Sequence, residues 1–313
     1  MLTIEWMKPS PRSLNWLGRR EGERTMAIII DDNTRVLVQG ATGKQGQFHL
    51  GQMLAYGTKV VGGISPGKGG QSVEGVPIFE TVVEAVEKVH PDASIIFIPS
   101  RGVKDAAFEA IDAGIKTVVI ITEHVPVHDE MAIMALAKER GTIVVGPNTF
   151  GIVSPGKCKM GIMPSAVFNT PGKVGVVARS GTLSYEITFN LNDAGVGQST
   201  VVGLGGDRVV GLNFVDVLKM FEADSGTEAV VLVGEIGGNA EEVAASYIKE
   251  MTKPVVAFLA GRSAPPGKRM GHAGAIIERG KGTFDSKVKA LTEAGVKVAK
   301  LPWEVADLVL KSL

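Results

Sequence analysis

Cysteine, aromatic residues, net charge and long apolar runs are all scarce in this sequence. A single cysteine in 313 residues excludes a disulfide framework and any zinc or iron–sulfur site that needs several cysteines. The 33 Lys and Arg residues balance the 33 Asp and Glu residues, so charge gives no reason to expect nucleic acid or an anionic membrane as a partner. No segment approaches the roughly 18 apolar residues that a membrane-spanning helix needs. With one cysteine and no secretory signal, we expect a cytoplasmic protein.

Glycine, by contrast, is abundant, and the apolar content is that of a globular protein. The chain has 40 glycines, and 44% of its residues are hydrophobic, which excludes a largely disordered protein. The length suffices for about two domains, each with its own core. Many glycines with few aromatic residues are typical of tight strand-to-helix turns and phosphate-binding loops.

The first 25 residues differ in character from the rest. They contain Trp6, Trp16 and the basic pair Arg19-Arg20, but no apolar core segment, and Met26 offers a second start site. We therefore interpret residues 1–25 as a disordered extension or an artefact of an upstream start.

From Met26 onward, short β-branched runs alternate with helical patterns. This alternation predicts an α/β fold, with parallel sheets that carry helices on both faces. The rhythm breaks at a segment rich in glycine and proline, which begins at Gly146-Pro147 and shows no clear helix. We therefore expect one domain at residues 26–147 and a second at 148–313. The expected strands are 35–39, 58–61, 94–98, 117–121, 142–145, 173–178, 199–202, 229–233 and 254–259, and the expected helices 48–55, 81–88, 103–113, 131–140, 182–194, 214–222, 240–251 and 284–294.

A glycine-rich turn after the first expected strand is the first functional signal. Its spacing is Gly40-x-x-Gly43-x-x-Gly46, which differs from the G-x-G-x-x-G pattern of dinucleotide-binding proteins. The second strand is expected to end in Gly62-Gly63, where an NAD-binding protein would place an acid for the ribose. The loop that follows supplies Lys68, which suits the 3′-phosphate of coenzyme A. The turn thus favours a CoA phosphate site over NAD, with a generic tight turn as the alternative.

A second strand, turn and helix follow at Arg179-Ser180-Gly181-Thr182. Ser180 can cap the helix, and Gly181 leaves backbone N–H groups open to an anion. An ordinary capped helix would have the same pattern, so this turn alone does not establish a site.

One histidine, His272, lies among small and basic residues in the segment Gly267–Ile276. A histidine in a glycine-rich, cationic loop can act as a nucleophile toward phosphorus. Glu235 follows an apolar strand and can accept a hydrogen bond from one ring nitrogen, which would direct the other at a phosphoryl group. A surface loop histidine and a surface glutamate are the alternatives. For a metal, His124 and His128 flank Pro126 without a third ligand, so we expect none.

Five segments of the chain closely resemble the α subunits of succinyl-CoA synthetase, also called succinate–CoA ligase. The resemblance runs from about Met26 to the end of the chain, has no counterpart in residues 1–25, and is most specific at the histidine. The segments are GTKVVGGISPGKGG (57–70), EAIDAGIKTVV (109–119), PGKVGVVARSGTLSYE (171–186), GEIGG (234–238) and GKRMGHAGAII (267–277).

The resemblance implies a fold, a reaction and a partner. The fold is an N-terminal Rossmann-like CoA-binding domain followed by a flavodoxin-like ligase domain. The reaction, a step of the tricarboxylic acid cycle, converts succinate, CoA and a nucleoside triphosphate to succinyl-CoA, the diphosphate and phosphate. The partner is a β subunit whose ATP-grasp domain binds ATP or GTP with Mg²⁺, in an αβ or α2β2 assembly. This chain contains no Walker phosphate-binding motif, which agrees with a nucleotide site on the partner.

The resemblance also implies roles for single residues. His272 becomes phosphorylated, Glu235 orients it, Ser180 and Gly181 open the helix that binds the phosphoryl group, and Tyr185 is associated with the substrate. The residues implied to contact CoA are Thr42, Gly43, Lys44, Gln45, Lys68, Ile98, Pro99, Ser100, Thr122 and Glu123.

Three departures from the family pattern leave the acid open. After Gly146-Pro147-Asn148, Thr149 and Phe150 stand where the family usually has a cysteine and a proline. Arg208 replaces the proline after Asp207, and Ser100-Arg101 replaces Ala-Pro. Phe150 and Arg208 could reshape a carboxylate pocket, so a malate–CoA or citrate–CoA ligase subunit is an alternative. A CoA-binding module without catalysis is a second alternative, which would need neither His272 nor Glu235. An NAD-dependent dehydrogenase is disfavoured by Gly62-Gly63.

Overall fold

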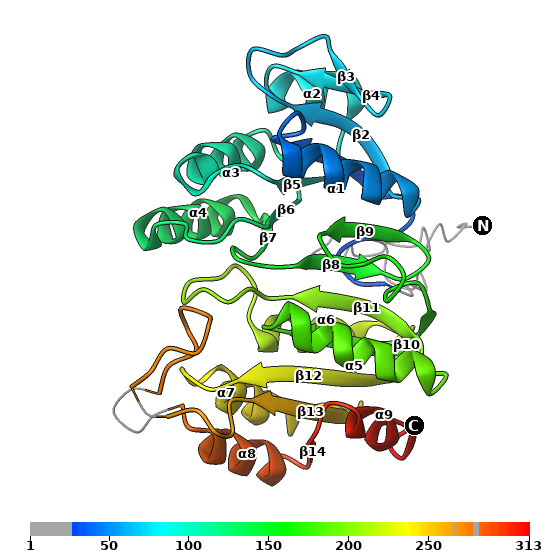
Figure 1. The fold of residues 1–313 in the computed structure, drawn as a ribbon, viewed down its shortest axis with the longest axis vertical. Coiled ribbons are helices and arrows are strands. Elements are labelled where there is room, and N and C mark those ends of the chain that lie inside the picture. Colours follow the sequence, from blue (N-terminus) through cyan, green and yellow to red (C-terminus); the bar gives the residue numbers. More distant parts are fainter. Residues whose placement is uncertain (1–26, 266, 278–281) are drawn as a thin grey trace, which may run out of the picture.

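Two seven-stranded sheets form the framework of the computed structural model, which describes residues 27–265, 267–277 and 282–313 (Figure 1). The extension expected at residues 1–25 lies outside the described residues. The first sheet has the order β3-β4-β2-β1-β5-β6-β7, and only β3 runs antiparallel to its neighbour. Its parallel strands follow the Rossmann order of two β-α-β halves that diverge from β1 and β5. The strands are β1 (Arg35–Gln39), β2 (Lys59–Ile64), β3 (Ser72–Val73), β4 (Val76–Phe79), β5 (Ala93–Ile96), β6 (Thr117–Ile120) and β7 (Ile143–Val145).

Helices cover both faces of this sheet because successive residues of each strand point to opposite sides. Val36 and Val38 of β1 pack with Leu50 and Met53 of the first helix, whereas Leu37 between them packs in a second apolar cluster with the other helices. The helices are α1 (Lys44–Ala55), α2 (Val82–Val89), α3 (Val103–Asp112) and α4 (Val127–Arg140), with a short 3-10 turn at η1 (Ser100–Gly102).

The second sheet has the order β14-β13-β12-β10-β11-β8-β9. Its five parallel strands follow the flavodoxin order, in which the direction of winding changes between β10 and β12. Helices α5 and α9 pack on one face, and α6, α7 and α8 pack on the other. The strands are β8 (Gly151–Ser154), β9 (Cys158–Gly161), β10 (Pro171–Ala178), β11 (Gln198–Gly203), β12 (Ala229–Glu235), β13 (Val255–Ala260) and β14 (Lys297–Ala299), and the helices α5 (Gly181–Asp193), α6 (Phe214–Ala223), α7 (Ala240–Ile248), α8 (Phe284–Glu293) and α9 (Glu304–Leu310).

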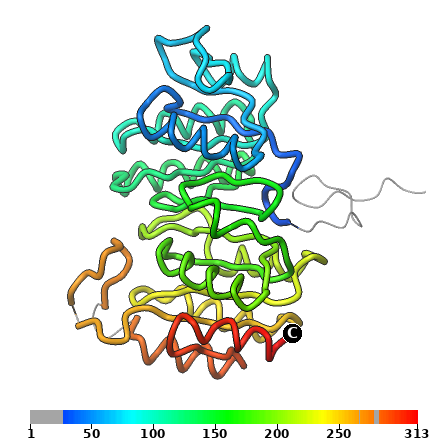
Figure 2. Tube along the Cα trace, turned by 45° about the vertical axis from the view of Figure 1, so that its right-hand side comes forward, coloured from blue at the N-terminus to red at the C-terminus, as the bar shows by residue number. Residues whose placement is uncertain are grey.

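The structure thus confirms the α/β class and the succession of a Rossmann-like and a flavodoxin-like sheet. The two units lie one above the other along the long axis, with α1 of the first unit packed against β9 of the second (Figures 1 and 2). The expected boundary at residue 147 falls between β7 and β8, and it stays a prediction. Among the described residues, no helix has the length and apolar character needed to cross a membrane.

One local expectation was wrong, and one element was not predicted. The segment after residue 147 has no helix, as expected, but it contains a β-hairpin, β8 and β9, which extends the second sheet antiparallel to β11. Strand β2 does not stop before Gly62-Gly63 but runs through both glycines to Ile64. A side chain at Gly62 would lie 2.8 Å from the Phe79 ring, and one at Gly63 would lie 2.5 Å from the Ala41 Cβ. These glycines therefore permit close packing inside the strand rather than ending it.

Candidate active site

A cavity of about 760 Å³ lies between the two units, at the carboxyl ends of strands from both sheets. Residues of the first unit line one side of it, including Gln45 at the start of α1 and Thr122 after β6. Residues of the second unit line the other side, including Arg179 after β10 and His272. Ligand sites of open α/β sheets are usually found at these strand ends. The site residues expected from the sequence that line the cavity are Gln45, Ile98, Pro99, Thr122, Glu123, Ser180, Gly181, Tyr185 and His272.

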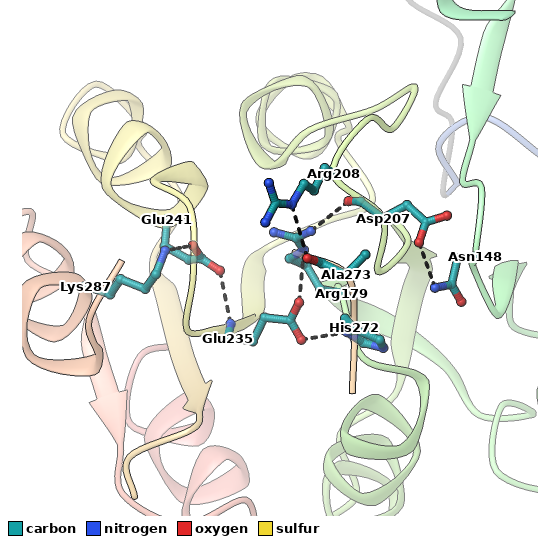
Figure 3. Close-up of polar contacts among 9 residues, drawn as sticks. All are labelled: Asn148, Arg179, Asp207, Arg208, Glu235, Glu241, His272, Ala273 and Lys287. Atoms are coloured by element: carbon teal, nitrogen blue, oxygen red, sulfur yellow. Dashed lines mark hydrogen bonds and ion pairs between the residues drawn. The ribbon is translucent and has the colours of Figure 1, made fainter. Parts of the chain in front are cut away.

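His272 and Glu235 form a direct hydrogen bond. The Nδ1 atom of His272 lies 2.7 Å from Oε2 of Glu235, which is the last residue of β12 (Figure 3). Since a carboxylate only accepts, Nδ1 carries the hydrogen and Nε2 is the nitrogen with the lone pair. The hydrogen bond to Glu235 raises the pKa of His272 above its ordinary value, against the lowering effect of burial. This is the arrangement in which a fixed carboxylate orients an imidazole for chemistry at its other nitrogen.

Arg179 supplies a fixed positive charge next to this pair. Its Nε atom lies 3.4 Å from Glu235 Oε1, and its Nη2 donates to the backbone carbonyl of Asp207 at 3.0 Å. Glu235 Oε1 has no hydrogen bond within the described part of the chain, so the ion pair with Arg179 is its main stabilising contact. The sequence showed Arg179 only as the first residue of a turn, and its position next to the histidine could not be inferred from it.

Glu235 is also fixed through its backbone, by a contact with Glu241. Its backbone N–H donates to Glu241 Oε1 at 3.0 Å, and Glu241 is paired with the buried Lys287 of α8 (Figure 3). Lys287 contacts Glu242 as well, at 3.1 Å. Breaking one partner of such a buried pair is costly, because it leaves an uncompensated charge. The end of β12 is therefore a rigid base for the histidine.

The N-terminus of α5 opens into the cavity beside His272. Ser180 is the N-cap residue, and its Oγ accepts from the backbone N–H of Leu183 at 3.4 Å. Gly181 and Thr182 are the first residues of the helix and line the cavity. A helix start with free N–H groups and a neighbouring Arg179 favours an anion such as a phosphoryl group.

The first glycine turn begins α1 on the opposite side of the cavity. Gly43 is the N-cap residue and makes no side-chain cap, so the helix start is left open. Gly40 has a φ of +79°, which glycine adopts without strain. A side chain at Gly46 would lie 2.0 Å from the carbonyl oxygen of Gly40, so only glycine lets the helix pack on the turn. The turn therefore has the geometry of a phosphate-binding loop.

Several expected CoA contacts do not line the cavity. Thr42 donates from Oγ1 to Ser65 Oγ at 3.0 Å, which ties the glycine turn to the loop that carries Lys68. Glu80 fixes that loop, since it accepts from the N–H groups of Gly67 and Gly69 at 2.6 Å each. The expected contacts outside the cavity lining are Thr42, Gly43, Lys44, Lys68 and Ser100.

Other cavity residues were missed or were given a different role. His49, which no sequence motif singled out, lines the cavity and stacks on Phe97 with ring centroids 5.3 Å apart. Phe150 lines the cavity and packs edge-on against Tyr185, with centroids 5.8 Å apart. Burial raises the pKa of Tyr185 to about 12, so its hydroxyl is protonated at neutral pH. Arg208 donates from Nε to the carbonyl of Ala273 at 3.3 Å, so it contacts the histidine segment and is not part of the cavity lining.

Comparison with known proteins agrees with this geometry. Residues 31–124 match the CoA binding domain family, and residues 177–297 match the CoA-ligase family. The first match contains the glycine turn of α1. The second contains Arg179, Ser180, Glu235 and His272. Each match thus contains residues that line one side of the cavity.

Relatives match over most of the chain. It is 59% identical over 288 residues to the succinate–CoA ligase [ADP-forming] subunit alpha 2 of Archaeoglobus fulgidus, which covers 92% of this chain and 100% of that protein. It is 57% identical over 289 residues to the corresponding subunit alpha of Methanothermobacter thermautotrophicus, with 92% and 98% covered.

Among solved structures, ATP citrate lyase from Methanothrix soehngenii, in complex with citrate and coenzyme A, is 26% identical with a TM-score of 0.80. The match covers 91% of this chain and 51% of that one, so this chain spans about half its length. The identity to the ligase subunits is far higher and extends over their full length. The chain therefore belongs to the family of succinate–CoA ligase α subunits.

Proposed function

We propose that this chain is the catalytic α subunit of a succinate–CoA ligase and that His272 carries the phosphoryl group during turnover. The 2.7 Å contact between His272 Nδ1 and Glu235 is the observation that supports this role most directly. A CoA-binding module without catalysis would need neither the pair nor the helix start beside it. The close relation to succinate–CoA ligase α subunits supports succinate as the acid.

In the first step, Nε2 of His272 attacks the terminal phosphorus of a nucleoside triphosphate. A P–N bond forms, the P–O bond to the diphosphate breaks, and the diphosphate leaves. Glu235 holds the Nδ1 hydrogen and stabilises the positive charge that develops on the ring. Arg179 and the N–H groups at the start of α5 stabilise the phosphoryl oxygens.

In the second step, the carboxylate of succinate attacks the phosphorus of phosphohistidine. The P–N bond breaks, its electron pair returns to Nε2, and succinyl phosphate forms. The thiolate of CoA then attacks the carbonyl carbon, a C–S bond forms, and phosphate leaves. Phe150 and Tyr185 line the cavity near His272 and would limit the size of the acid.

CoA would lie along the first unit, with its pantetheine thiol directed into the cavity. The open start of α1, at Thr42 to Gln45, would bind the pyrophosphate, and Lys68 would pair with the 3′-phosphate. Ile98, Pro99, Ser100, Thr122 and Glu123 follow β5 and β6 and would contact the rest of the molecule.

The nucleotide would come from a partner. We expect a β subunit with an ATP-grasp domain, which binds ATP or GTP with Mg²⁺, in an αβ or α2β2 complex. The glycine-rich segment around His272 would let the histidine move between that nucleotide site and the CoA site. The single cysteine supports the proposed cytoplasmic location.

A discharge assay on the complex of this chain with its β subunit tests the proposal. The complex is loaded with labelled phosphate from ATP or GTP, CoA is added, and loss of the label is followed with succinate, malate or citrate. We expect an acid-labile label on His272 and rapid loss with succinate. Rapid loss of the label with malate or citrate, and not with succinate, would show that the substrate is that acid. No label with either nucleotide would overturn the phosphohistidine mechanism.

A further inference from the structure

Two buried carboxyl groups from different units face one another beside the active site. Glu130 lies in the first turn of α4 and is 1% exposed, and Asp207 lies in the loop after β11 and is 7% exposed. Their side chains lie within hydrogen-bonding reach of each other. Glu130 Oε2 and Asp207 Oδ2 are both buried, and neither has a hydrogen-bond donor among the described residues. Two buried carboxylates in contact would repel strongly, whereas one proton held between them turns the repulsion into a hydrogen bond.

The loop that carries Asp207 contacts Asn148, Arg179 and the histidine segment. Asp207 Oδ1 accepts from Asn148 Nδ2 at 3.0 Å, and its backbone carbonyl accepts from Arg179 (Figure 3). The neighbouring Gly206 donates from its N–H to Asn148 and accepts at its carbonyl from the N–H of Gly274, in the histidine segment. The position of Asp207 therefore determines where Asn148 and Arg179 present their side chains to the cavity.

We propose that Glu130 and Asp207 share one proton, and that this pair fixes the CoA-binding unit against the phosphohistidine site by holding Asn148 and Arg179 in place. Both are positioning residues, since neither lines the cavity. The shared proton joins a helix of the first unit to a loop of the second without an ion pair. The catalytic part of the inference rests on the proposed function, and the structural part does not.

The charged groups nearby, in the part of the chain that the structure describes, have partners other than Glu130. Arg179 is directed at the backbone carbonyl of Asp207 and at Glu235, and His272 is bonded to Glu235. On α4 itself, the neighbouring Asp129 is paired with Lys104 of α3 at 3.0 Å. Burial, followed by the contact with Asp207, raises the pKa of Glu130 to about 8. Glu130 therefore holds its proton at neutral pH and releases it in mildly alkaline solution.

Glu130→Gln separates this inference from a merely structural role. The amide donates a hydrogen to Asp207 as the protonated acid does, but it cannot lose that hydrogen as the pH rises. We expect E130Q to phosphorylate His272 at pH 7 within about threefold of wild type. Above pH 8, the ratio of the E130Q rate to the wild-type rate should rise about tenfold per pH unit, because only wild type loses the shared proton. Glu130→Ala, which has no donor, should be at least about tenfold slower than wild type at pH 7.

The thermal stability of the complex without nucleotide gives a readout that does not depend on catalysis. Folded wild type retains a proton that the unfolded chain releases above the ordinary pKa of a carboxyl group. Its stability therefore falls as the pH rises from about 5 to about 8, and it then levels off. E130Q lacks this loss, so the Tm difference between E130Q and wild type should grow over that range. Asp129→Asn, one residue away on α4, is the matched control and should show no such trend.

The outcomes distinguish the inference from the proposed function. A Tm difference that grows with pH, together with no labelled His272 in wild type, would support the pair and reject the phosphohistidine mechanism. A Tm difference and a rate ratio that are both independent of pH would overturn the shared proton, whatever the state of His272. A growing Tm difference with a flat rate ratio would also overturn the proposal, since the pair would then not position the active site.

Discussion

The two helix starts that face each other across the cavity have the same backbone plan and different surroundings. At α1, the turn Gly40–Gly46 leaves an N-terminus with no side-chain cap, and Gly43, Lys44 and Gln45 are exposed. At α5, Ser180 caps the helix, Arg179 precedes it, and His272 lies beside it, bonded to Glu235.

If the proposed function is right, this difference separates a site that binds and releases a ligand, at α1, from a site where a reaction takes place, at α5. An exposed helix start with few side chains can bind a phosphate group and release it, because nothing has to move. A helix start among buried charges is preorganised for an anion whose charge changes during the reaction. We therefore expect changes at α1 to alter CoA affinity without altering phosphorylation, and changes at α5 to do the reverse. A change at α1 that slows phosphorylation, or a change at α5 that weakens CoA binding, would contradict this distinction.

The largest effect should come from removing the nucleophile. His272→Ala should abolish incorporation of labelled phosphate from the nucleotide and all turnover, since it removes the proposed nucleophile. Its affinity for CoA, measured by calorimetry, should stay within about twofold of wild type, because the proposed site for the CoA phosphates lies on the α1 side. His128→Ala, on the exposed side of α4, is the control. Phosphorylation that persists in His272→Ala would mean that the site beside α5 does not act through His272.

The next effect should come from the carboxylate behind the histidine. Glu235→Gln should slow phosphorylation about 10²- to 10³-fold, because the ring loses its orienting and charge-stabilising partner. The pH profile should change as well. Below the pKa of His272 both ring nitrogens carry hydrogens, so phosphorylation falls as the pH drops through that value, which Glu235 has raised.

Loss of the carboxylate lowers this pKa, so the acid limb of Glu235→Gln should move to lower pH even as the maximum rate drops. Rapid-quench measurement of the labelled enzyme between pH 5 and 9 would show both changes. Glu228→Gln, which removes a carboxylate from an exposed pair with Lys173, should change neither. An acid limb that stays in place would mean that Glu235 does not control the protonation of His272.

The features that could be predicted from the sequence are those that lie within one short stretch of chain. The Gly40–Gly46 turn and the segment around His272 each contain their chemistry in a few consecutive residues, so their roles could be proposed before the fold was known. Strand and helix alternation was sufficient for the α/β class, because buried parallel strands are continuous apolar runs.

The features that were missed depend on residues far apart in the chain. Gly62-Gly63 suggested a strand end, since nothing in the sequence indicates that Phe79 and Ala41 pack against them. Hairpin β8–β9 was missed because glycine and proline dominate its segment, and its strands form by pairing with β11. Glu130 and Asp207 each look like surface acids in the sequence, and only the meeting of two units buries them together.

A smaller effect should come from the loop beside α1. Lys68→Ala should weaken CoA binding by about 1.5–3 kcal/mol, because a charge-assisted contact with the 3′-phosphate is lost. Binding of dephospho-CoA, which lacks this phosphate, should be unchanged. Phosphorylation of His272 should be unchanged too. Lys116→Ala removes an exposed lysine elsewhere in the same unit and should affect neither ligand. An equal loss for both ligands would mean that Lys68 does not read the 3′-phosphate.

The smallest effect should come from Ser180→Ala, which tests whether the N-cap of α5 only stabilises the helix or also takes part in the reaction. Ser180→Ala removes the acceptor for the Leu183 N–H and should cost about 1 kcal/mol of stability. Thr81→Ala removes an equivalent cap from α2, where Thr81 accepts from the Glu84 N–H and lies outside the cavity lining. The two variants should lose similar stability in urea unfolding. If the open N–H groups of Gly181 and Thr182 hold the phosphoryl group, Ser180→Ala should slow phosphorylation only slightly more than Thr81→Ala does. A large and specific slowing in Ser180→Ala would mean that the serine hydroxyl itself contacts the transferred group, and that α5 differs from α1 by a side chain in the reaction and not by its surroundings alone.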